Sequence, residues 1–517
     1  MSTTTDTLPL TLTFRSFGSA IEIDWKSEYA DGNGIPTPFV MPYTNQELAL
    51  VVRALDAAQR GGAHFDGAEQ EVLAALGLWV HGAVVPKAYR RVGRRLYDAL
   101  GERGAMLISN YQSIGSRDGR PLAYVLRIPQ SLTDVASLPW EALTDPGGPV
   151  LSARGHGLDW CERYVLTGQT VLPPPPAQVV PHILVIAPRF CISDAVREQE
   201  RRSRMEVWEP LVEQGQMSYH DLDPVTPRAL NEYLNNARHP PDLIHYVGHG
   251  IYEDGEGMLL FDNGQGGKAT VSAAQLKARL PNTRVAVVFA CQSAMAIGAD
   301  SLLTGIGPAL STVVGAVVAM QLSIRISAVA RFNTTFYTEL LTQGRSLQQA
   351  MASARLTLYF EDSDELDWYV PALYIRANDM QPIYIPLGPK VKPPSPPSRP
   401  PGPEVRVSPI EAHPLRLTLI PGEHDWTLQV ENMSNEELTA IRIMLNLQRA
   451  KTFDLRPNHP EAIPRLAPGS TNTSLRLTLT PPQASGEQEV GIRASLRVAG
   501  RPTLTDTVTM KVHFISV

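Results

Sequence analysis

From about Pro181 to Pro386, short apolar runs alternate with amphipathic stretches, as in a parallel sheet covered by helices. The apolar runs predict these strands: His182–Ala187, Met217–Asp221, Leu243–Val247, Val285–Ala290 and Val314–Met320. Apolar residues at helical spacing predict these helices: Glu198–Glu213, Pro227–Ala237, Ser272–Leu280, Ile326–Thr342 and Ser346–Tyr359. We therefore expect a doubly wound α/β layer with helices on both faces of a mostly parallel sheet.

The pattern before and after this layer differs from it. The first 170 residues mix a strand pair around Leu10–Trp25, a strand at Ala123–Arg127, and helical stretches at Asn45–Gln59, Ala68–Val80 and Tyr89–Leu100. The last 110 or so residues carry alternating runs that predict these strands: Leu415–Ile420, Trp426–Val430, Ile441–Leu447, Ser474–Leu479 and Val508–Phe514. Turn residues separate these runs, so we expect an immunoglobulin-like β-sandwich, although this region has no cysteine pair.

Proline-rich segments mark the boundaries between these parts. Residues 388–403 read GPKVKPPSPPSRPPGP and predict a semi-rigid polyproline spacer, and a second proline run occupies Pro173–Pro176. The predicted organisation is an N-terminal α+β region at 1–170, an α/β domain at 171–387, a linker at 388–404 and a β-sandwich at 405–517.

Composition narrows the classes of function. The hydrophobic fraction of 43% is that of a globular protein, and the net charge of −6 gives no bias toward nucleic acid or anionic membrane, so we expect protein partners. The three cysteines, Cys161, Cys191 and Cys291, are widely spaced and fit a reducing compartment. The start carries no signal-like segment and no run is long and apolar enough to cross a membrane, so we expect a cytoplasmic protein.

Two predicted strands each end in a chemically reactive residue beside small neighbours. The run DLIHYVGHG places His249 between two glycines, and the run VAVVFACQSA ends its apolar strand at Cys291. If these strands are parallel neighbours, they lie about 4.8 Å apart and their carboxyl ends meet where open α/β sheets bind ligands. The 42 intervening residues contain a hairpin at Gly257–Asn263 and the helix at Ser272–Leu280, which supply the required crossover.

A thiol and an imidazole so placed can cleave an acyl bond. Cys291 is the candidate nucleophile and His249 the candidate base and acid, while the backbone N–H groups of Gly250 and Cys291 are candidate donors to the oxyanion. Each residue also has a simpler interpretation, since a cysteine that ends an apolar strand is commonly a core residue. No cofactor or metal is expected: His245 fits a core position, and NGQGGK at Asn263–Lys268 fits a turn better than a phosphate loop.

Several motifs across residues 45–386 resemble the CHAT family of caspase-like, separase-related cysteine peptidases. In chain order they are LPWEAL (138–143), HILVIAP (182–188), HYVGHG (245–250), VVFACQSA (287–294), VGAVVAM (314–320), FYTELLTQGRSLQQAMASAR (336–355) and WYVPALYI (368–375). The resemblance implies a caspase-like fold, His249 as base or acid and Cys291 as nucleophile. It gives Trp140 and Glu141 a structural role, and it implies limited proteolysis in bacterial signalling or defence.

The leading hypothesis is a regulated cysteine endopeptidase that cuts a specific protein, with the sandwich docking the substrate or an activator. A non-catalytic signalling scaffold with the same fold is the alternative, and a hydrolase of another acyl bond is a third. The residue preferred before the cut is open. Phe289, two positions before Cys291, supplies no charge, and nothing in the sequence places Asp194, Glu198 or Asp300 near the site.

Overall fold

The computed structural model describes two compact units, residues 1–394 and 395–517. In the first, residues 7–389 are described except 19, 29–34, 62, 152–158, 169–177, 191–192, 237–239, 254, 281–282, 292, 295–300, 362–365 and 377–381. In the second, residues 415–514 are described except 422–424, 433–436, 449–454, 458–461, 469, 480–485 and 498–503. The expected boundary at residue 170, both proline runs apart from Gly388 and Pro389, Cys191 and Asp300 fall outside these ranges.

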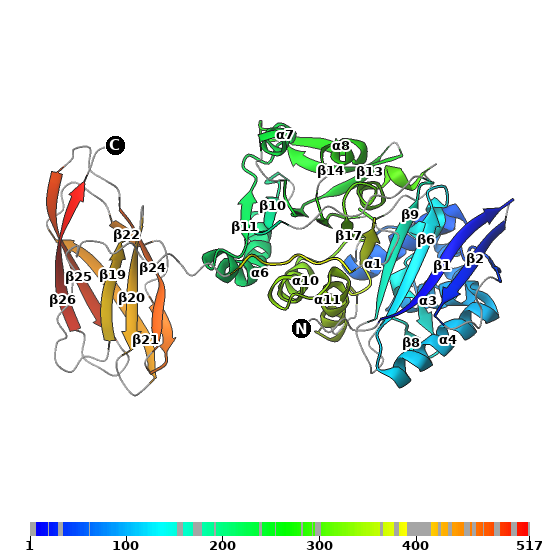
Figure 1. Ribbon diagram of the computed structural model, residues 1–517, viewed down its shortest axis with the longest axis horizontal. Coiled ribbons are helices and arrows are strands. Elements are labelled where there is room, and N and C mark those ends of the chain that lie inside the picture. The colour runs from blue at the N-terminus through cyan, green and yellow to red at the C-terminus, as the bar shows by residue number, and fades with distance from the viewer. Residues whose placement is uncertain are drawn as a thin grey trace. The chain divides into compact units, whose positions relative to one another are not determined.

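One mixed sheet runs through the described part of the first unit (Figure 1). Its strands, in spatial order, are β11 (Ser218–Asp221), β10 (His182–Ile186), β12 (Leu243–Val247), β16 (Val285–Phe289), β17 (Ala316–Met320), β18 (Pro371–Ile375), β9 (Trp160–Leu166), β6 (Leu122–Pro129), β1 (Leu8–Phe17), β2 (Ala20–Ser27) and β3 (Thr37–Phe39). The pairs β17–β18, β1–β2 and β2–β3 are antiparallel, and the others are parallel. The predicted large, mostly parallel α/β sheet is therefore confirmed.

Side chains that alternate along the central strands enter two separate cores, because successive strand residues point to opposite faces. Along β16, for example, Val285, Val287 and Phe289 enter one core, and Ala286 and Val288 enter the other. Three helices cover the first face: α6 (Asp194–Glu213), α10 (Ile326–Tyr337) and α11 (Leu347–Glu361). Three others cover the second face: α7 (Pro227–Asn236), α8 (Ala273–Arg279) and α9 (Ile306–Leu310).

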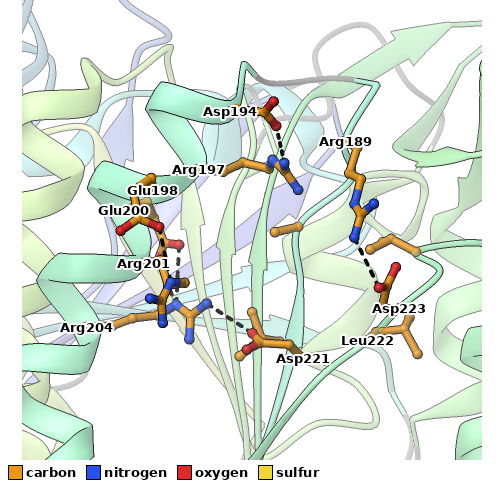
Figure 2. A pocket seen from close by; sticks show the side chains of 13 residues that line it. Arg189, Asp194, Arg197, Glu198, Glu200, Arg201, Arg204, Asp221, Leu222 and Asp223 are labelled. Atoms are coloured by element: carbon orange, nitrogen blue, oxygen red, sulfur yellow. Dashed lines mark hydrogen bonds and ion pairs between the residues drawn. The ribbon is translucent and has the colours of Figure 1, made fainter. Parts of the chain in front are cut away.

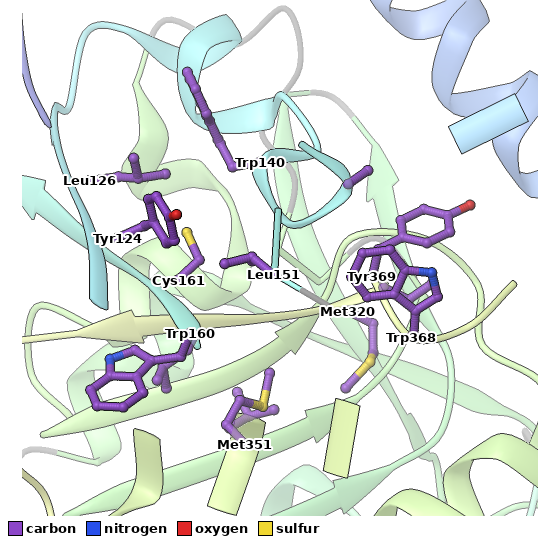
Figure 3. Close-up of a cluster of buried hydrophobic side chains, with 14 of the residues drawn as sticks. Tyr124, Leu126, Trp140, Leu151, Trp160, Cys161, Met320, Met351, Trp368 and Tyr369 are labelled. Carbon is purple, nitrogen blue, oxygen red and sulfur yellow. The ribbon is translucent and has the colours of Figure 1, made fainter. Parts of the chain in front are cut away.

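The N-terminal strands extend this sheet and share the first core (Figure 1). Helices pack with them: α1 (Asn45–Arg60), α2 (Gly67–Ala75), α3 (Ala88–Ala99), α4 (Gly101–Asp118) and the short α5 (Thr133–Ser137). Thr44 begins α1 with a capping box, in which its hydroxyl accepts from the Glu47 N–H and the Glu47 carboxylate accepts from the Thr44 N–H. Figure 3 shows Trp140 and Cys161 in the same cluster as Met320 and Trp368.

Small elements connect these parts. A three-stranded antiparallel sheet of β13 (Gly250–Glu253), β14 (Glu256–Asp262) and β15 (Lys268–Ser272) lies in the crossover between β12 and β16. The segment NGQGGK is a turn, as expected, because the Asn263 side chain accepts from the N–H groups of Gln265 and Gly267. The other elements are β4 (Trp79–Val80), β5 (Ala83–Val84), η1 (Trp140–Ala142), β7 (Thr144–Asp145), β8 (Gly148–Pro149), η2 (Leu302–Thr304) and the π-helical η3 (Thr338–Thr342).

The described part of the second unit consists of two four-stranded antiparallel sheets. One has the order β19 (Leu415–Pro421), β20 (Asp425–Asn432), β24 (Thr471–Leu479) and β22 (Leu455–Pro457). The other has the order β23 (Ala462–Leu466), β21 (Leu438–Gln448), β25 (Gly486–Arg497) and β26 (Leu504–Phe514). All five strands predicted in this region are present.

Several features depart from the sequence prediction. The hairpin expected at Gly257–Asn263 is a single strand, β14, of the three-stranded sheet, and strands β3 and β18 were not predicted. The helix predicted at Ala68–Val80 ends at Ala75, because a turn at Gly77, with φ of 73°, precedes the β4–β5 hairpin. Helix α4 was not predicted, since its glycines weaken the helical pattern. Strand β9 was not predicted either, because it buries two charged residues, Glu162 and Arg163. Among the described residues, no helix combines the length and apolar character needed to span a membrane.

Candidate active site

Strands β12 and β16 bring His249 and Cys291 to the same edge of the sheet. The two strands are parallel neighbours, as predicted, and their register ends at Val247 opposite Phe289. His249 and Cys291 each lie two residues beyond that pair, and the Gly248 N–H donates to the Phe289 carbonyl at 3.0 Å. The His249 residue is exposed and Cys291 is half-buried, so a substrate can approach both from solvent.

The glycines on either side of His249 are required by close packing. A methyl group at Gly248 would lie 2.6 Å from the Tyr246 hydroxyl oxygen, and one at Gly250 would lie 2.8 Å from the Cys291 carbonyl oxygen. Both distances are shorter than side chains allow. The two glycines therefore let the turn that carries His249 lie close to the Tyr246 side chain and to the backbone of Cys291.

The hydroxyl of Tyr246 holds this turn by hydrogen bonds to backbone carbonyls. It lies 3.0 Å from the His249 carbonyl oxygen and 2.7 Å from the Leu260 carbonyl oxygen. The Leu260 N–H also donates to the His249 carbonyl, at 3.0 Å. The backbone of His249 is thus attached to β14 and to β12, whereas its side chain remains at the surface.

Hydrogen-bond alternation between β13 and β14 orients the N–H of Gly250. Gly250 pairs with Leu259, and the hydrogen bond from Leu260 to His249 identifies the preceding pair as the hydrogen-bonded kind. The Gly250–Leu259 pair is then the non-hydrogen-bonded kind, so the Gly250 N–H points away from β14. This direction suits a donor to a bound substrate.

The loop after Cys291 is attached to the end of β17. The Ser293 hydroxyl accepts from the Met320 N–H at 2.9 Å, and the Ala294 N–H donates to the Met320 carbonyl at 3.0 Å. The Gly307 N–H donates to the Ser293 carbonyl at 2.8 Å, and the Tyr374 hydroxyl donates to the Ala294 carbonyl at 2.9 Å. Side chains and backbone from three other elements therefore hold the two described residues that follow Cys291 most closely.

A buried ionic cluster lies beneath β12, and we call Glu200, Arg204, His245 and Tyr337 the β12 cluster. His245 is fully buried, as expected of a core histidine, and contacts the Tyr337 hydroxyl through Nδ1 at 2.6 Å and Glu200 through Nε2 at 2.7 Å. Burial alone would raise the pKa of the Glu200 carboxyl, but His245 and Arg204 hold that pKa below its ordinary value.

A charged cavity of about 420 Å³ adjoins this cluster where β10 and β11 end. Its walls come from those two strands and from α6, and they include Asp194 and Glu198. Figure 2 shows Arg204 bonded to Asp221 and Arg189 bonded to Asp223, at 3.0 Å in both pairs. Phe289 does not line it; this side chain is buried against His245 and Phe332.

Sequence reasoning placed His249, Gly250 and Cys291 at this edge but missed the residues that hold them. Tyr246, Ser293 and Tyr374 contact the two loops, yet each occupies an ordinary position of a strand or turn. Ser293 and Tyr374 make these contacts with segments distant in the chain, so no local spacing identifies them. The available signal was that all three lie in quoted motifs: Tyr246 in HYVGHG, Ser293 in VVFACQSA and Tyr374 in WYVPALYI.

Comparison with solved structures found similarity at low sequence identity. A solved protease structure has 10% sequence identity and a TM-score of 0.35, covering 78% of this chain and 88% of the other. The Arg-specific cysteine proteinase gingipain R (RgpB) has 10% identity and a TM-score of 0.34, covering 82% and 88%. The complex of the RgpB pro- and mature domains from Porphyromonas gingivalis has 10% identity and a TM-score of 0.34, covering 90% and 97%.

No curated protein matches the sequence. A family model does match it: the CHAT domain aligns with residues 90–400. This range includes every strand of the long sheet except β1, β2 and β3, and both candidate catalytic residues. This is more than half of the chain, and it agrees with the motifs found in the sequence. The chain therefore belongs to the CHAT family.

Proposed function

We propose that this protein is a regulated cysteine endopeptidase in which Cys291 is the nucleophile and His249 the general base and acid. The observation that carries the proposal is the register of β12 and β16, which ends at Val247 opposite Phe289, two residues before His249 and before Cys291. Solvent reaches both residues, as a peptide substrate requires. Membership of the CHAT family supports the same reaction.

The reaction is a two-step acyl transfer. His249 takes the Cys291 proton, the sulfur attacks the scissile carbonyl carbon, and the N–H groups of Gly250 and Cys291 donate to the oxyanion. When the C–N bond breaks, His249 returns the proton to the leaving amine and a thioester remains. Water, deprotonated by His249, then attacks the thioester, which releases the acid and restores the thiol.

The experiment compares new N-termini in cells that contain the intact chain or its Cys291→Ala variant. We expect cleavage to disappear in the variant while its folding is unchanged. Cys161→Ala is the matched control, because Cys161 is a buried core thiol and its removal should leave cleavage in place. Cleavage that continues without Cys291 would remove this residue from the mechanism.

A thiol-directed probe distinguishes the peptidase from a scaffold with the same fold. A peptidase activated by its partner should be labelled at Cys291, whereas a non-catalytic scaffold should show no labelling above that of the unfolded chain. Profiling with peptide and non-peptide acyl substrates then separates an endopeptidase from another acyl hydrolase.

We propose limited proteolysis of one protein target in the cytoplasm, as part of bacterial signalling or defence. The low cysteine content supports a reducing compartment, and the resemblance to the CHAT family supports this role. The second unit is proposed to be an immunoglobulin-like sandwich that binds the substrate or an activator. Its support is the sequence order within the sheets: β21, β25 and β26 are neighbours as in the three-stranded sheet of that fold.

A further inference from the structure

Within the sheet, the N-terminal strands join the strands that carry the site between β9 and β18. The ladder there has a single matched pair, Arg163 opposite Tyr374. The same two side chains belong to a buried group, Glu141, Arg163, Gln321 and Tyr374, which we call the seam cluster. A joint with little backbone pairing is thus held mainly by side chains.

Polar contacts within the seam cluster are dense. Arg163 forms an ion pair with Glu141, donates to the Gln321 side-chain oxygen at 2.8 Å and lies 3.4 Å from the Tyr374 hydroxyl. The Gln321 amide donates to Glu141 at 2.6 Å. Arg163 also donates to the Ala136 carbonyl at 2.6 Å, so the segment before the LPWEAL motif is bound as well.

Tyr374 and Gln321 connect the seam cluster to the loop that follows Cys291. The Tyr374 hydroxyl donates to the Ala294 carbonyl at 2.9 Å, three residues after Cys291. Gln321 directly follows Met320, whose backbone bonds both Ser293 and Ala294. The buried charges of the N-terminal region are therefore two hydrogen bonds away from the backbone of the Cys291 loop.

Stability alone gives a weak reason for such a cluster. Removing two ions from water costs several kcal/mol each, and a buried ion pair often stabilises a protein no more than apolar residues of the same volume. Glu141 and Arg163 are both fully buried. A defined geometry at the Cys291 loop is what the apolar alternative would not supply.

We propose that Glu141 and Arg163 are positioning residues for Cys291, acting through Tyr374 on the Ala294 carbonyl. The seam cluster then links the N-terminal strands to the position of Cys291. This inference rests on the proposed function, because it assigns a role in the reactivity of the same cysteine. Tyr374 holds the loop, and the ion pair fixes where the Tyr374 hydroxyl lies.

The first test is Tyr374→Phe, which keeps the ring and removes the hydroxyl. We expect kcat to fall about tenfold with KM unchanged, since one lost hydrogen bond corresponds to roughly that factor. We also expect a comparable fall in the rate at which iodoacetamide alkylates Cys291, measured across pH by mass spectrometry of the Cys291 peptide. Tyr111→Phe is the matched control, because its buried hydroxyl accepts from the Glu28 N–H in the N-terminal region.

The second test removes the ion pair as a whole, in Glu141→Gln with Arg163→Met. The buried Arg355, which donates to the Trp368 and Glu141 carbonyls, is left unchanged. We expect this variant to fold, with an alkylation rate of Cys291 reduced by tenfold or more. Alkylation and kcat equal to those of Tyr111→Phe in either test would overturn the inference.

Failure of this inference is distinguishable from failure of the proposed function. If Cys291→Ala abolishes cleavage while Tyr374→Phe behaves as Tyr111→Phe, the peptidase stands and the positioning role falls. If cleavage does not depend on Cys291, the peptidase falls, and the alkylation rates alone decide whether the seam cluster positions the thiol.

Discussion

The β12 cluster and the seam cluster both place a carboxylate and an arginine in the core, but they differ in their access to solvent. Arg163 and Glu141 are sealed from water and their partners are buried too. Arg204 is also buried, yet it binds Asp221, which is 48% exposed and lines an open cavity (Figure 2). The seam cluster is thus enclosed by the protein on all sides, whereas the β12 cluster is connected to solvent through Asp221.

This difference suggests different uses for two clusters of similar chemistry. Burial alone would lower the pKa of the Arg163 guanidinium, but Glu141 beside it raises that pKa, so the guanidinium stays protonated at every ordinary pH. In the β12 cluster the carboxylate has several partners, since Glu200 also contacts His245 and the Asn333 amide. Removing one partner of Glu200 should therefore lower the free energy of unfolding less than removing Arg163 from the seam cluster.

The largest effect should follow removal of one charge from the seam cluster. Arg163→Met leaves the buried Glu141 carboxylate with the Gln321 amide as its donor and with Arg355 as the nearby cation, which donates to the Glu141 backbone carbonyl. We expect the free energy of unfolding to fall by about 3–5 kcal/mol. Arg204→Met is the matched change in the β12 cluster, where Glu200 keeps His245, and we expect about 1–3 kcal/mol. Chemical denaturation measures both, and equal losses would contradict the comparison.

A third buried carboxylate shows the effect of neutral partners. Glu162 accepts from the Tyr164 hydroxyl and the Gln348 amide, and burial raises the pKa of its carboxyl to about 7, above the ordinary 4.5. Its contribution is fully present below pH 4.5 and is lost as the pH rises through about 7. Glu162→Gln should flatten this decline, which amounts to roughly 3 kcal/mol at most.

Denaturation curves from pH 4 to 8 test this prediction. The intact chain should lose more stability over that range than Glu162→Gln does. A variant that follows the same pH profile as the intact chain would show that Glu162 ionises without cost in the folded state.

The smallest effect should come from the exposed end of the β12 cluster. Asp221→Asn removes a carboxylate that is half in water, so we expect a loss of about 1 kcal/mol or less, and a smaller one in high salt. Asp223→Asn, at the pair with Arg189 where both side chains are more than 60% exposed, is the control and should change almost nothing. A loss from Asp221→Asn as large as that from Arg163→Met would mean that the two clusters do not differ in solvent access.

The sequence predicted the central strands closely because their apolar runs are bounded by clear breaks. Leu243–Val247 was predicted without error, and Val285–Ala290 differs from β16 by one residue. A parallel pairing of β12 with β16 was considered because the intervening residues could supply a crossover, and the structure confirms that pairing, which brings His249 and Cys291 to the same edge of the sheet.

What the sequence did not predict depends on contacts between distant segments. Glu162 and Arg163 made β9 look unlike a buried strand, because their partners Gln348 and Glu141 are far away in the chain. Tyr374 is indistinguishable from a core aromatic until β18 is placed between β17 and β9. Tertiary hydrogen bonds of this kind leave no periodicity in the sequence.

The two outer strands of the long sheet bear on whether a further chain can pair with its edges. At one border, β3 has three residues with Pro38 at its centre, which offers no amide hydrogen. At the other, β11 is four residues long and ends in Asp221. Neither border is a good template for another chain, so a sheet of this breadth is protected against growing into fibres.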